Sequence, residues 1–347
     1  MKEMVFGLTK KGETVRQYEL SCKKMKIVIS EYGAAVQTLM VSDANGILRD
    51  VVLGYDTLQE YEIGNEKMGA VIGRIANRVS GASVFLEGKE YTLDKNDGEN
   101  CRDGGFCGFH RRVWKNVRKS TNELTFSLDS RDGDQGIPGN LHIEVTYSLN
   151  EDMEFSVRYY AESDKDSFLN LTNRIYFNLH GQGNGDIMDH VLQIYSDKYM
   201  PLRGEDRIPD GTIQNVFSTA FDFGYPKRIG RELYSEDIQL KYGNGYDHNY
   251  LIALNKGTMK TIANVKSEKT GIGMEVRSSM PGMQFCTGNE IEVQKGKGKA
   301  TYYPHSGFVL EPQYWPDSMN TKGFLPCAIR AGVPWKSETV YRFYQLW

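Results

Sequence analysis

Apolar and polar residues alternate along several stretches of this 347-residue chain, and this alternation limits its fold more than any other feature. Every second residue is apolar within 142–149 and again within 153–159. A period of two places these apolar side chains on one face of a β-strand. Shorter stretches with the same character lie at 124–128, 273–277 and 339–343.

Turn-forming residues separate the predicted strands. Gly, Pro, Asn and Asp cluster at 97–98, 131–133, 138–140, 209–211 and 269–271. Such clusters between alternating stretches indicate tight turns, and no helical pattern with a clear apolar stripe extends beyond two or three turns. Many strands with short connections predict an all-β sandwich or barrel. We found no linker and no internal repeat, so we predict a single domain over residues 1–347.

Composition and charge exclude some classes of function. Hydrophobic residues make up 39% of the chain and charged residues 25%, which suits a large folded core. The 42 basic and 45 acidic residues are dispersed, without the basic run of a nucleic-acid-binding protein. No stretch has the length of a membrane span or the pattern of a secretory signal. We therefore expect a small-molecule partner, no nucleic acid, no membrane, and a monomer or homodimer.

The cysteines and histidines predict neither disulfides nor a metal. The five cysteines are odd in number and contain no C-x-x-C pair, whereas a disulfide framework or a zinc site has characteristic cysteine spacings. The six histidines show no metal-ligand spacing such as H-E-x-x-H. We expect a reducing, cytoplasmic location and no metal.

Glu311 is the first candidate for chemistry. It lies in the apolar stretch Gly-Phe-Val-Leu-Glu-Pro-Gln at 307–313, and Pro312 favours an extended conformation for the residue before it. A carboxylate buried in such a strand has a raised pKa and can act as a general base. A solvated glutamate at a strand end fits the same letters.

Further polar side chains interrupt otherwise apolar stretches. Asp247 precedes the apolar residues 250–252, where it can cap a turn or bind sugar hydroxyls. Asn77 and Arg78 belong to the segment 73–78, where arginines need an ion pair or a ligand. Arg174 stands in the alternating run Asn-Leu-Thr-Asn-Arg-Ile-Tyr-Phe-Asn-Leu and calls for an anionic partner. Asp103 precedes two glycines that allow close backbone approach.

Taken together, these segments resemble the aldose 1-epimerase (galactose mutarotase) family. The matching strings are GRIANR (73–78), GFHRRVW (108–114), DGDQGIPGNL (132–141), NLTNRIYFNL (170–179), GYDHN (245–249), PGMQFCTGN (281–289) and HSGFVLEPQYWPDSMN (305–320). Their order extends the resemblance from about residue 5 to the C-terminus. It implies a large antiparallel β-sandwich, the galactose mutarotase-like supersandwich.

The resemblance also implies an activity and a set of site residues. The family interconverts the α and β anomers of aldoses without a cofactor. A glutamate removes the proton of the anomeric hydroxyl while a histidine protonates the ring oxygen. Glu311 matches the base, and the positions that bind the sugar are matched by Asn77, Arg78, Asp247 and Gln284.

The chain departs from the family at both active-site histidines. Arg174 stands at the position of the acid histidine, and Asp103 stands at that of the second histidine. An arginine does not release a proton near neutral pH. We predict a salt bridge between Asp103 and Arg174 across the site, which would lower the pKa of Asp103.

Three functions remain open from the sequence. The first is a working aldose 1-epimerase for a hexose, in which Glu311 acts with another donor such as water or His180. The second is an epimerase-like enzyme for an anionic sugar held by Arg174. The third is a non-catalytic carbohydrate-binding protein. Tyr176, Tyr246 and Trp315 can stack on a sugar or pack within the protein.

Overall fold

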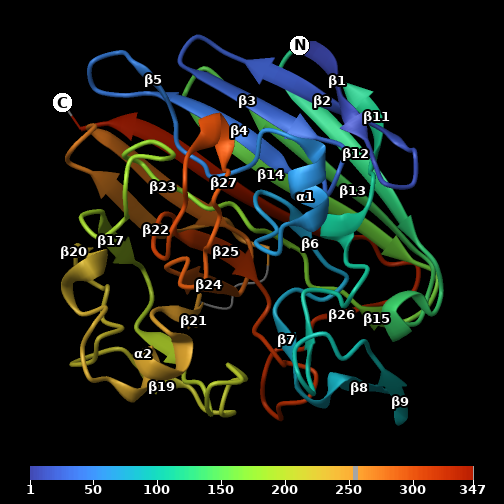
Figure 1. The fold of residues 1–347 in the computed structure, drawn as a ribbon. Helices are drawn as coiled ribbons and strands as arrows, with labels where there is room; N and C mark the ends of the chain where they lie inside the picture. Colours follow the sequence, from blue (N-terminus) through green and yellow to red (C-terminus); the bar gives the residue numbers. More distant parts are fainter. Residues whose placement is uncertain (253–256, 347) are drawn as a thin grey trace.

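The computed structural model describes residues 1–252 and 257–346, and its largest element is an antiparallel sheet (Figure 1). Its strands follow the order β11-β12-β13-β14-β27-β23-β22-β17-β20. Their bounds are β11 (Lys115–Lys119), β12 (Glu123–Ser130), β13 (Leu141–Leu149), β14 (Glu154–Ser163), β27 (Trp335–Gln345), β23 (Ile272–Ser278), β22 (Lys260–Ser267), β17 (Val191–Ile194) and β20 (Lys227–Arg228). All five stretches predicted as strands fall in this sheet. Only Met153 of those stretches lies outside, in the turn before β14.

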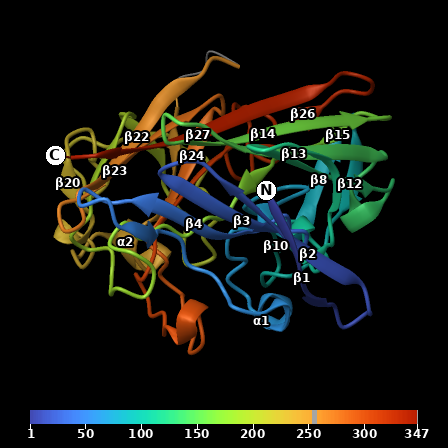
Figure 2. The ribbon, with the colours of Figure 1, turned by 90° about the horizontal axis from the view of Figure 1, so that it is seen from above.

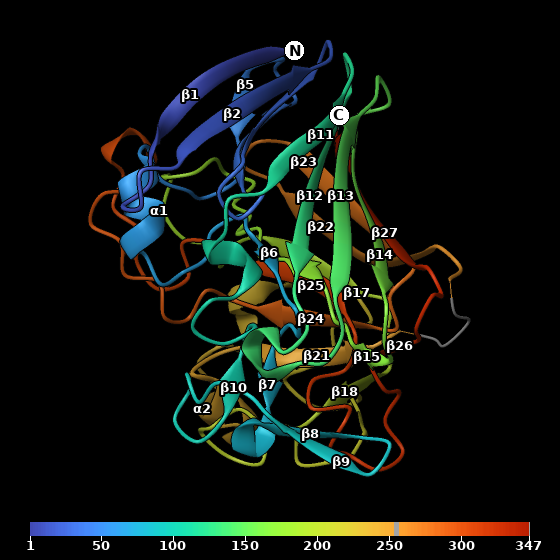
Figure 3. The same ribbon diagram turned by 90° about the vertical axis from the view of Figure 1, so that its right-hand side faces the viewer.

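A second antiparallel sheet lies at the N-terminal end of the chain. It runs in sequence order through β1 (Lys2–Leu8), β2 (Thr14–Ser21), β3 (Met25–Ser30), β4 (Val36–Ser42) and β5 (Leu48–Asp50). The rings of Tyr18 on β2 and Phe126 on β12 pack edge to face with centroids 5.7 Å apart. Figures 2 and 3 show this blue sheet beside the green strands of the largest sheet. The two sheets therefore form the predicted sandwich.

The third large sheet carries most of the chemistry discussed below. Its order is β19 (Gln214–Asn215), β18 (Lys198–Met200), β21 (Asp247–Leu251), β24 (Gly282–Cys286) and β25 (Val309–Gln313). Figure 3 shows β18, β21, β24 and β25 in the half of the molecule away from the N-terminus. Neighbouring strands pair antiparallel with a defined register. Side chains of paired residues on adjacent strands therefore lie side by side on the same face of the sheet.

Short elements connect the sheets. The two-stranded pairs are β6 (Val71–Ile72) with β16 (Thr172–Asn173), β7 (Arg78–Val79) with β10 (Cys101–Arg102), β8 (Ser83–Leu86) with β9 (Lys89–Thr92), and β15 (Ser167–Phe168) with β26 (Ala328–Ile329). The α-helices of the described residues are α1 (Leu58–Ile63) and α2 (Ile238–Gly243). Single 3₁₀ turns lie at Ser80–Ala82, Phe109–Arg111, Asp134–Gly136, Ile229–Arg231 and Lys297–Lys299. Within residues 1–252 and 257–346, no helix is long and apolar enough to cross a membrane.

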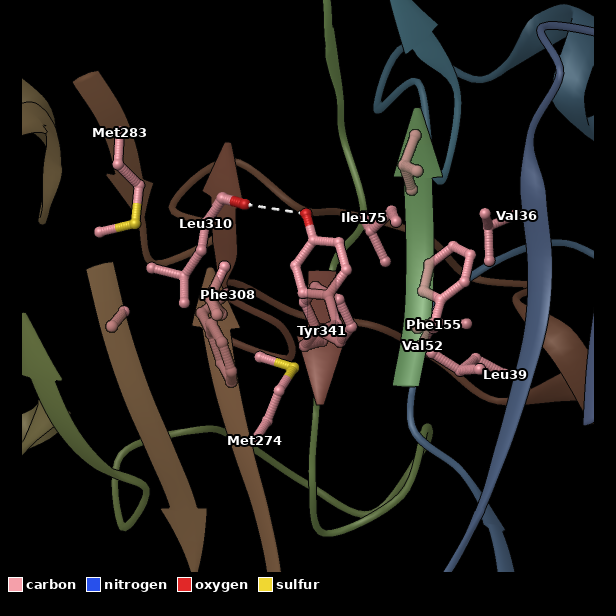
Figure 4. Packing of buried hydrophobic residues seen from close by; sticks show 14 of the residues in the cluster. Val36, Leu39, Val52, Phe155, Ile175, Met274, Met283, Phe308, Leu310 and Tyr341 are labelled. Atoms are coloured by element: carbon pink, nitrogen blue, oxygen red, sulfur yellow. Dashed lines mark hydrogen bonds between the residues drawn. The ribbon is translucent and has the colours of Figure 1, made fainter. Parts of the chain in front are cut away.

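One apolar core joins the three large sheets. Its members include Ile27 of β3, Val145 of β13 and Phe285 of β24, all fully buried. Figure 4 shows Tyr341 of β27 reaching towards β25, where its hydroxyl donates to the carbonyl of Leu310 at 3.4 Å. Because alternate residues of a strand point to opposite faces, Glu311 points away from the face that Leu310 presents to this core.

Candidate active site

Three neighbouring strands place the predicted acidic and amide side chains on one face of a sheet. In the register, Gln284 of β24 lies opposite Glu311 of β25 on one side and opposite Asn249 of β21 on the other. Asp247 precedes Asn249 by two positions and so shares its face. The alternating pattern therefore brings Asp247, Gln284 and Glu311 together, although the sequence separates them widely.

Glu311 lies on a strand that can accommodate the following proline. β25 is the last strand of its sheet and pairs only with β24 there, and edge strands are where a proline is tolerated within a sheet. The Glu311 residue is 1% exposed. Burial raises the pKa of its carboxyl above the usual value, and the charge of Arg174 offsets only part of this rise.

The predicted salt bridge between Asp103 and Arg174 is confirmed. Nη1 of Arg174 donates to Oδ2 of Asp103 at 2.8 Å, and Nη2 lies 3.4 Å from Oδ1. The same guanidinium donates through Nε to Oε1 of Glu311 at 3.0 Å. All three nitrogens of Arg174 thus contact protein carboxylates. Although burial opposes the charged form, Asp103 and Glu311 hold the pKa of Arg174 well above its usual value.

Asp103 is surrounded by cations. Oδ2 of this fully buried residue also accepts a hydrogen bond from Nζ of Lys67 at 2.7 Å, and Nε of Arg102 lies 3.5 Å away. Oδ1 accepts from the backbone N–H of Asn77 at 3.0 Å. Burial would raise the pKa of Asp103, but Arg174, Lys67 and Arg102 outweigh it and hold that pKa well below the usual value. Asp103 is therefore an ionised anchor and not a proton donor near neutral pH.

Asp247 forms a second cluster on the other side of the site. Its Oδ1 accepts a hydrogen bond from the Gln284 side chain at 2.8 Å. Its Oδ2 lies 3.8 Å from Arg78 and 3.7 Å from Arg207. Burial raises the pKa of Asp247, but the nearby arginines and Gln284 more than compensate, so the pKa is lowered.

These clusters border a cavity of about 150 Å³. Its lining residues are Asn65, Glu66, Arg102, Arg174, Tyr176, Arg207, Asp247, Cys286, Gly288, Asn289, Glu290, Ile291, Val309 and Glu311. The floor comes from Cys286 of β24 and from the alternate residues Val309 and Glu311 of β25, and Arg174 enters from the segment that follows β16. The cavity is thus lined by ionised and hydrogen-bonding groups around one buried glutamate.

Arg174, Asp247 and Glu311 are the predicted site residues that line this cavity. Asp103 and Gln284 lie directly behind them, as described above. Arg78 donates to Asp97 at 2.8 Å, and the Asn77 side chain accepts from the backbone N–H of Arg78. The structure therefore places Asn77, Arg78 and Gln284 in the layer that positions Asp103 and Asp247.

Sequence reasoning missed several cavity residues. Arg102 and Arg207 present guanidinium groups to the cavity, and Cys286 and Asn289 complete its wall. Arg102 is the neighbour of the candidate Asp103 in the sequence, and this was the only sign that it lies at the site. Arg207 lies in a polar loop between β18 and β19 with no periodic pattern.

Some other candidates have structural roles. Arg74 is fully buried and donates to the backbone carbonyls of residues 130, 131, 138 and 139, so it holds together the two ends of the loop between β12 and β13. A Cβ at Gly104 would lie 2.0 Å from the carbonyl oxygen of Gly73, so this glycine permits backbone contact inside the protein. Tyr246 packs on Phe223 and Trp315 on Phe324.

His180 does not lie on the cavity that holds Glu311. Its ring packs against His190 with centroids 4.1 Å apart, and burial lowers its pKa. A larger cavity of about 410 Å³ lies beside Pro281 and Trp335. Among its described lining residues there is no carboxylate and no imidazole, the groups that most often act as general bases.

Solved structures define the class of protein to which this fold and site correspond. An aldose epimerase homologue from C. elegans superimposes with a TM-score of 0.87 at 28% identity, covering 95% of this chain and 99% of that one. Galactose 1-epimerase from Lactobacillus acidophilus gives 0.85 at 25% identity, with 99% and 98% coverage. The fold is therefore that of the galactose mutarotase-like β-sandwich proteins.

Sequence comparisons identify the family. The aldose 1-epimerase family model matches residues 16–342. Galactose mutarotase from Rattus norvegicus is 39% identical over 341 residues, 98% of this chain and 97% of that protein. Aldose 1-epimerase from Escherichia coli K12 is 34% identical, with 92% of each chain covered. This chain belongs to the aldose 1-epimerase family.

Proposed function

We propose that this protein interconverts the α and β anomers of a hexose by opening and closing the pyranose ring. The observation that carries the proposal is the state of Glu311. This buried carboxylate lines the cavity, its pKa is raised, and Arg174 fixes its Oε1. Its Oε2 accepts no hydrogen bond from the residues that the structure describes, which leaves it for a substrate hydroxyl.

Glu311 acts as the general base in this proposal. A carboxylate desolvated by burial is a stronger base than one in water. It removes the proton of the anomeric hydroxyl as the bond between C1 and the ring oxygen breaks. Rotation about the C1–C2 bond and reclosure then give the other anomer, with Glu311 returning the proton. Asp247 and Asn289 line the same cavity and supply hydrogen-bonding groups for the remaining hydroxyls.

The surroundings of Arg174 support a neutral substrate over the anionic sugar considered from the sequence. Its three nitrogens already contact Asp103 and Glu311. A substrate carboxylate held by Arg174 would have to displace one of these buried contacts, which costs free energy. The geometry therefore favours a neutral hexose at Glu311. The monomeric or dimeric state and the cytoplasmic location remain predictions from the sequence.

Polarimetry tests the proposed function. The optical rotation of freshly dissolved α-galactose and α-glucose is followed with the wild-type protein, with Glu311→Gln, and in buffer alone. We expect the wild type to accelerate mutarotation of at least one sugar and Glu311→Gln to lose about 10²–10⁴-fold of that rate. A wild-type rate equal to that in buffer for both sugars would refute the proposal.

A further inference from the structure

Ring opening requires a proton donor as well as a base, and the two residues at the family's histidine positions do not supply one. Arg174 holds its protons because its pKa is raised, and Asp103 is ionised because its pKa is lowered. Without a donor, the departing ring oxygen would leave as an alkoxide in a buried site, which is unfavourable. The inference below names the donor and rests on the proposed function.

The titratable side chains of the cavity leave two candidates. Three are arginines, which do not release a proton near neutral pH. Asp247 and Glu290 have lowered pKa values and are ionised. Glu66 already has a protein partner, because its Oε2 accepts a hydrogen bond from the Tyr55 hydroxyl. Among the described residues of the lining, Tyr176 and Cys286 are then the groups with an O–H or S–H proton to transfer.

Tyr176 occupies the better position. It follows Arg174 by two residues, between the end of β16 and the bridge residue Phe177, and both side chains line the cavity. It is 8% exposed and lines the cavity together with Glu311. Its hydroxyl makes no hydrogen bond to another described residue of the chain. We propose that the Tyr176 hydroxyl donates the proton to the ring oxygen of the hexose.

The proposed step conserves protons and charge. Glu311 takes the proton of the anomeric hydroxyl, the C1–O bond to the ring oxygen breaks, and C1 becomes an aldehyde. The ring oxygen receives the Tyr176 proton and becomes a hydroxyl. On closure this hydroxyl attacks either face of the aldehyde and returns its proton to Tyr176, while Glu311 protonates the former carbonyl oxygen.

The position of Arg174 suits the transfer of negative charge between Glu311 and Tyr176. One negative charge moves from Glu311 to Tyr176 during opening, and Arg174 interacts with both side chains. Burial raises the pKa of Tyr176, while the positive charges of Arg174 and Arg102 act against that rise. The arginine therefore stabilises the charge before and after the transfer without itself losing a proton.

Cys286 is the competing donor. It pairs with Asp247 across the β21–β24 ladder, and burial and then Asp247 raise its pKa to about 12. A thiol is a weak hydrogen-bond donor compared with a phenol. Arg174 lowers the pKa of this thiol less than the backbone N–H groups of Gly288 and Asn289 do, whereas Arg174 is the foremost group that lowers the pKa of Tyr176. The geometry thus favours Tyr176.

The test compares Tyr176→Phe with Cys286→Ala and with Tyr302→Phe, by mutarotation kinetics on the sugar that the wild type accepts. Tyr302 is a matched buried tyrosine whose hydroxyl contacts Gln182 at 2.7 Å and does not line the cavity. We expect Tyr176→Phe to lower kcat by about 10²–10⁴-fold with little change in KM. Tyr302→Phe is expected to keep the wild-type kcat.

A second measurement separates a chemical role from a structural one. Replacing Tyr176 by a fluorotyrosine keeps its shape and lowers the pKa of the phenol. We expect the alkaline loss of kcat to move to lower pH in this variant only. A full kcat in Tyr176→Phe, or a loss confined to Cys286→Ala, would overturn the inference while the proposed function stands. An inactive wild type would overturn both.

Discussion

Nε of Arg174 lies 3.0 Å from Oε1 of Glu311, although 137 positions separate the two residues in the sequence. The other end of the same guanidinium contacts Asp103. One buried cation thus joins two buried carboxylates, one of them on the floor of the cavity. The stability and the chemistry of the site are linked through this arrangement.

Asp103→Asn is expected to destabilise the protein strongly near neutral pH. The substitution leaves the charges of Arg174, Lys67 and Arg102 without their common anion. Removing one partner of a buried ion pair costs about 3–5 kcal/mol. Equilibrium denaturation at pH 7 measures this loss. A difference below about 1 kcal/mol would show that the cations find other partners. Asp189→Asn, which removes an exposed partner of Arg228, is the control and should have little effect.

The cost of Asp103→Asn should depend on pH. The pKa of Asp103 is well below its usual value in the folded protein, so the folded state binds this proton more weakly than the unfolded chain. Its stabilising contribution is complete above the unfolded pKa of about 3.9 and is lost as pH falls through the folded pKa. The difference between wild type and variant should therefore shrink below about pH 4. A difference that is constant from pH 7 into this range would contradict the assignment.

Glu311→Gln should separate activity from stability. The folded pKa of Glu311 is raised, so its ionised form opposes folding at pH values above that pKa. The amide oxygen of glutamine can still accept from Nε of Arg174. We expect the variant to unfold at a temperature equal to or above that of the wild type at pH 7, while mutarotation is lost. Thermal unfolding by calorimetry measures this. A clear loss of stability would show that the carboxylate mainly holds Arg174 in place.

As the pH is lowered, kcat/KM should fall with a midpoint above the usual pKa of a glutamate side chain. The base must be ionised, and burial raises the pKa of Glu311 from its usual value near 4.5. Below that raised pKa the protonated carboxyl does not accept the anomeric proton. A profile of kcat/KM against pH for the free enzyme is the measurement. An acid limb with its midpoint well below pH 4.5 would contradict the environment described for Glu311.

Cys286 should react slowly with alkylating reagents. Burial raises the pKa of its thiol to about 12, so the reactive thiolate is scarce at pH 8. Cys107, in contrast, is exposed. Timed iodoacetamide labelling followed by mass spectrometry should find Cys107 modified before Cys286. Rapid labelling of Cys286 would show that the cavity wall is more open and more polar than the structure indicates.

The sequence predicted the sandwich because long strands with one buried face leave a period-two pattern. In β13, the residues at 143, 145, 147 and 149 are buried as that pattern requires. The two-residue strands β6 and β16 position Arg174 but are too short to show any period. Their pairing depends on contacts between distant segments, which local propensity does not encode.

Residues of the candidate site could be predicted where they interrupt an apolar stretch or match a family position, but not where they lie in loops. Arg174 was singled out because a charge in an apolar run needs a partner, Glu311 because its strand is apolar, and Asp103 because of its glycine pair and its place at a family histidine position. The structure shows that Arg174 contacts both carboxylates. Lys67 lies in a loop, so no pattern indicated its contact with Asp103. Arg207 likewise reaches the cavity from a loop whose path is set only by the folded chain.

Exchange between anomers at equilibrium tests the central claim most directly. Magnetisation-exchange NMR on the anomeric protons of galactose and glucose measures the interconversion without any coupled reaction. The account predicts exchange cross-peaks between the α and β signals with the wild type, and their loss with Glu311→Gln. Exchange with the wild type no faster than with Glu311→Gln or in buffer would contradict it.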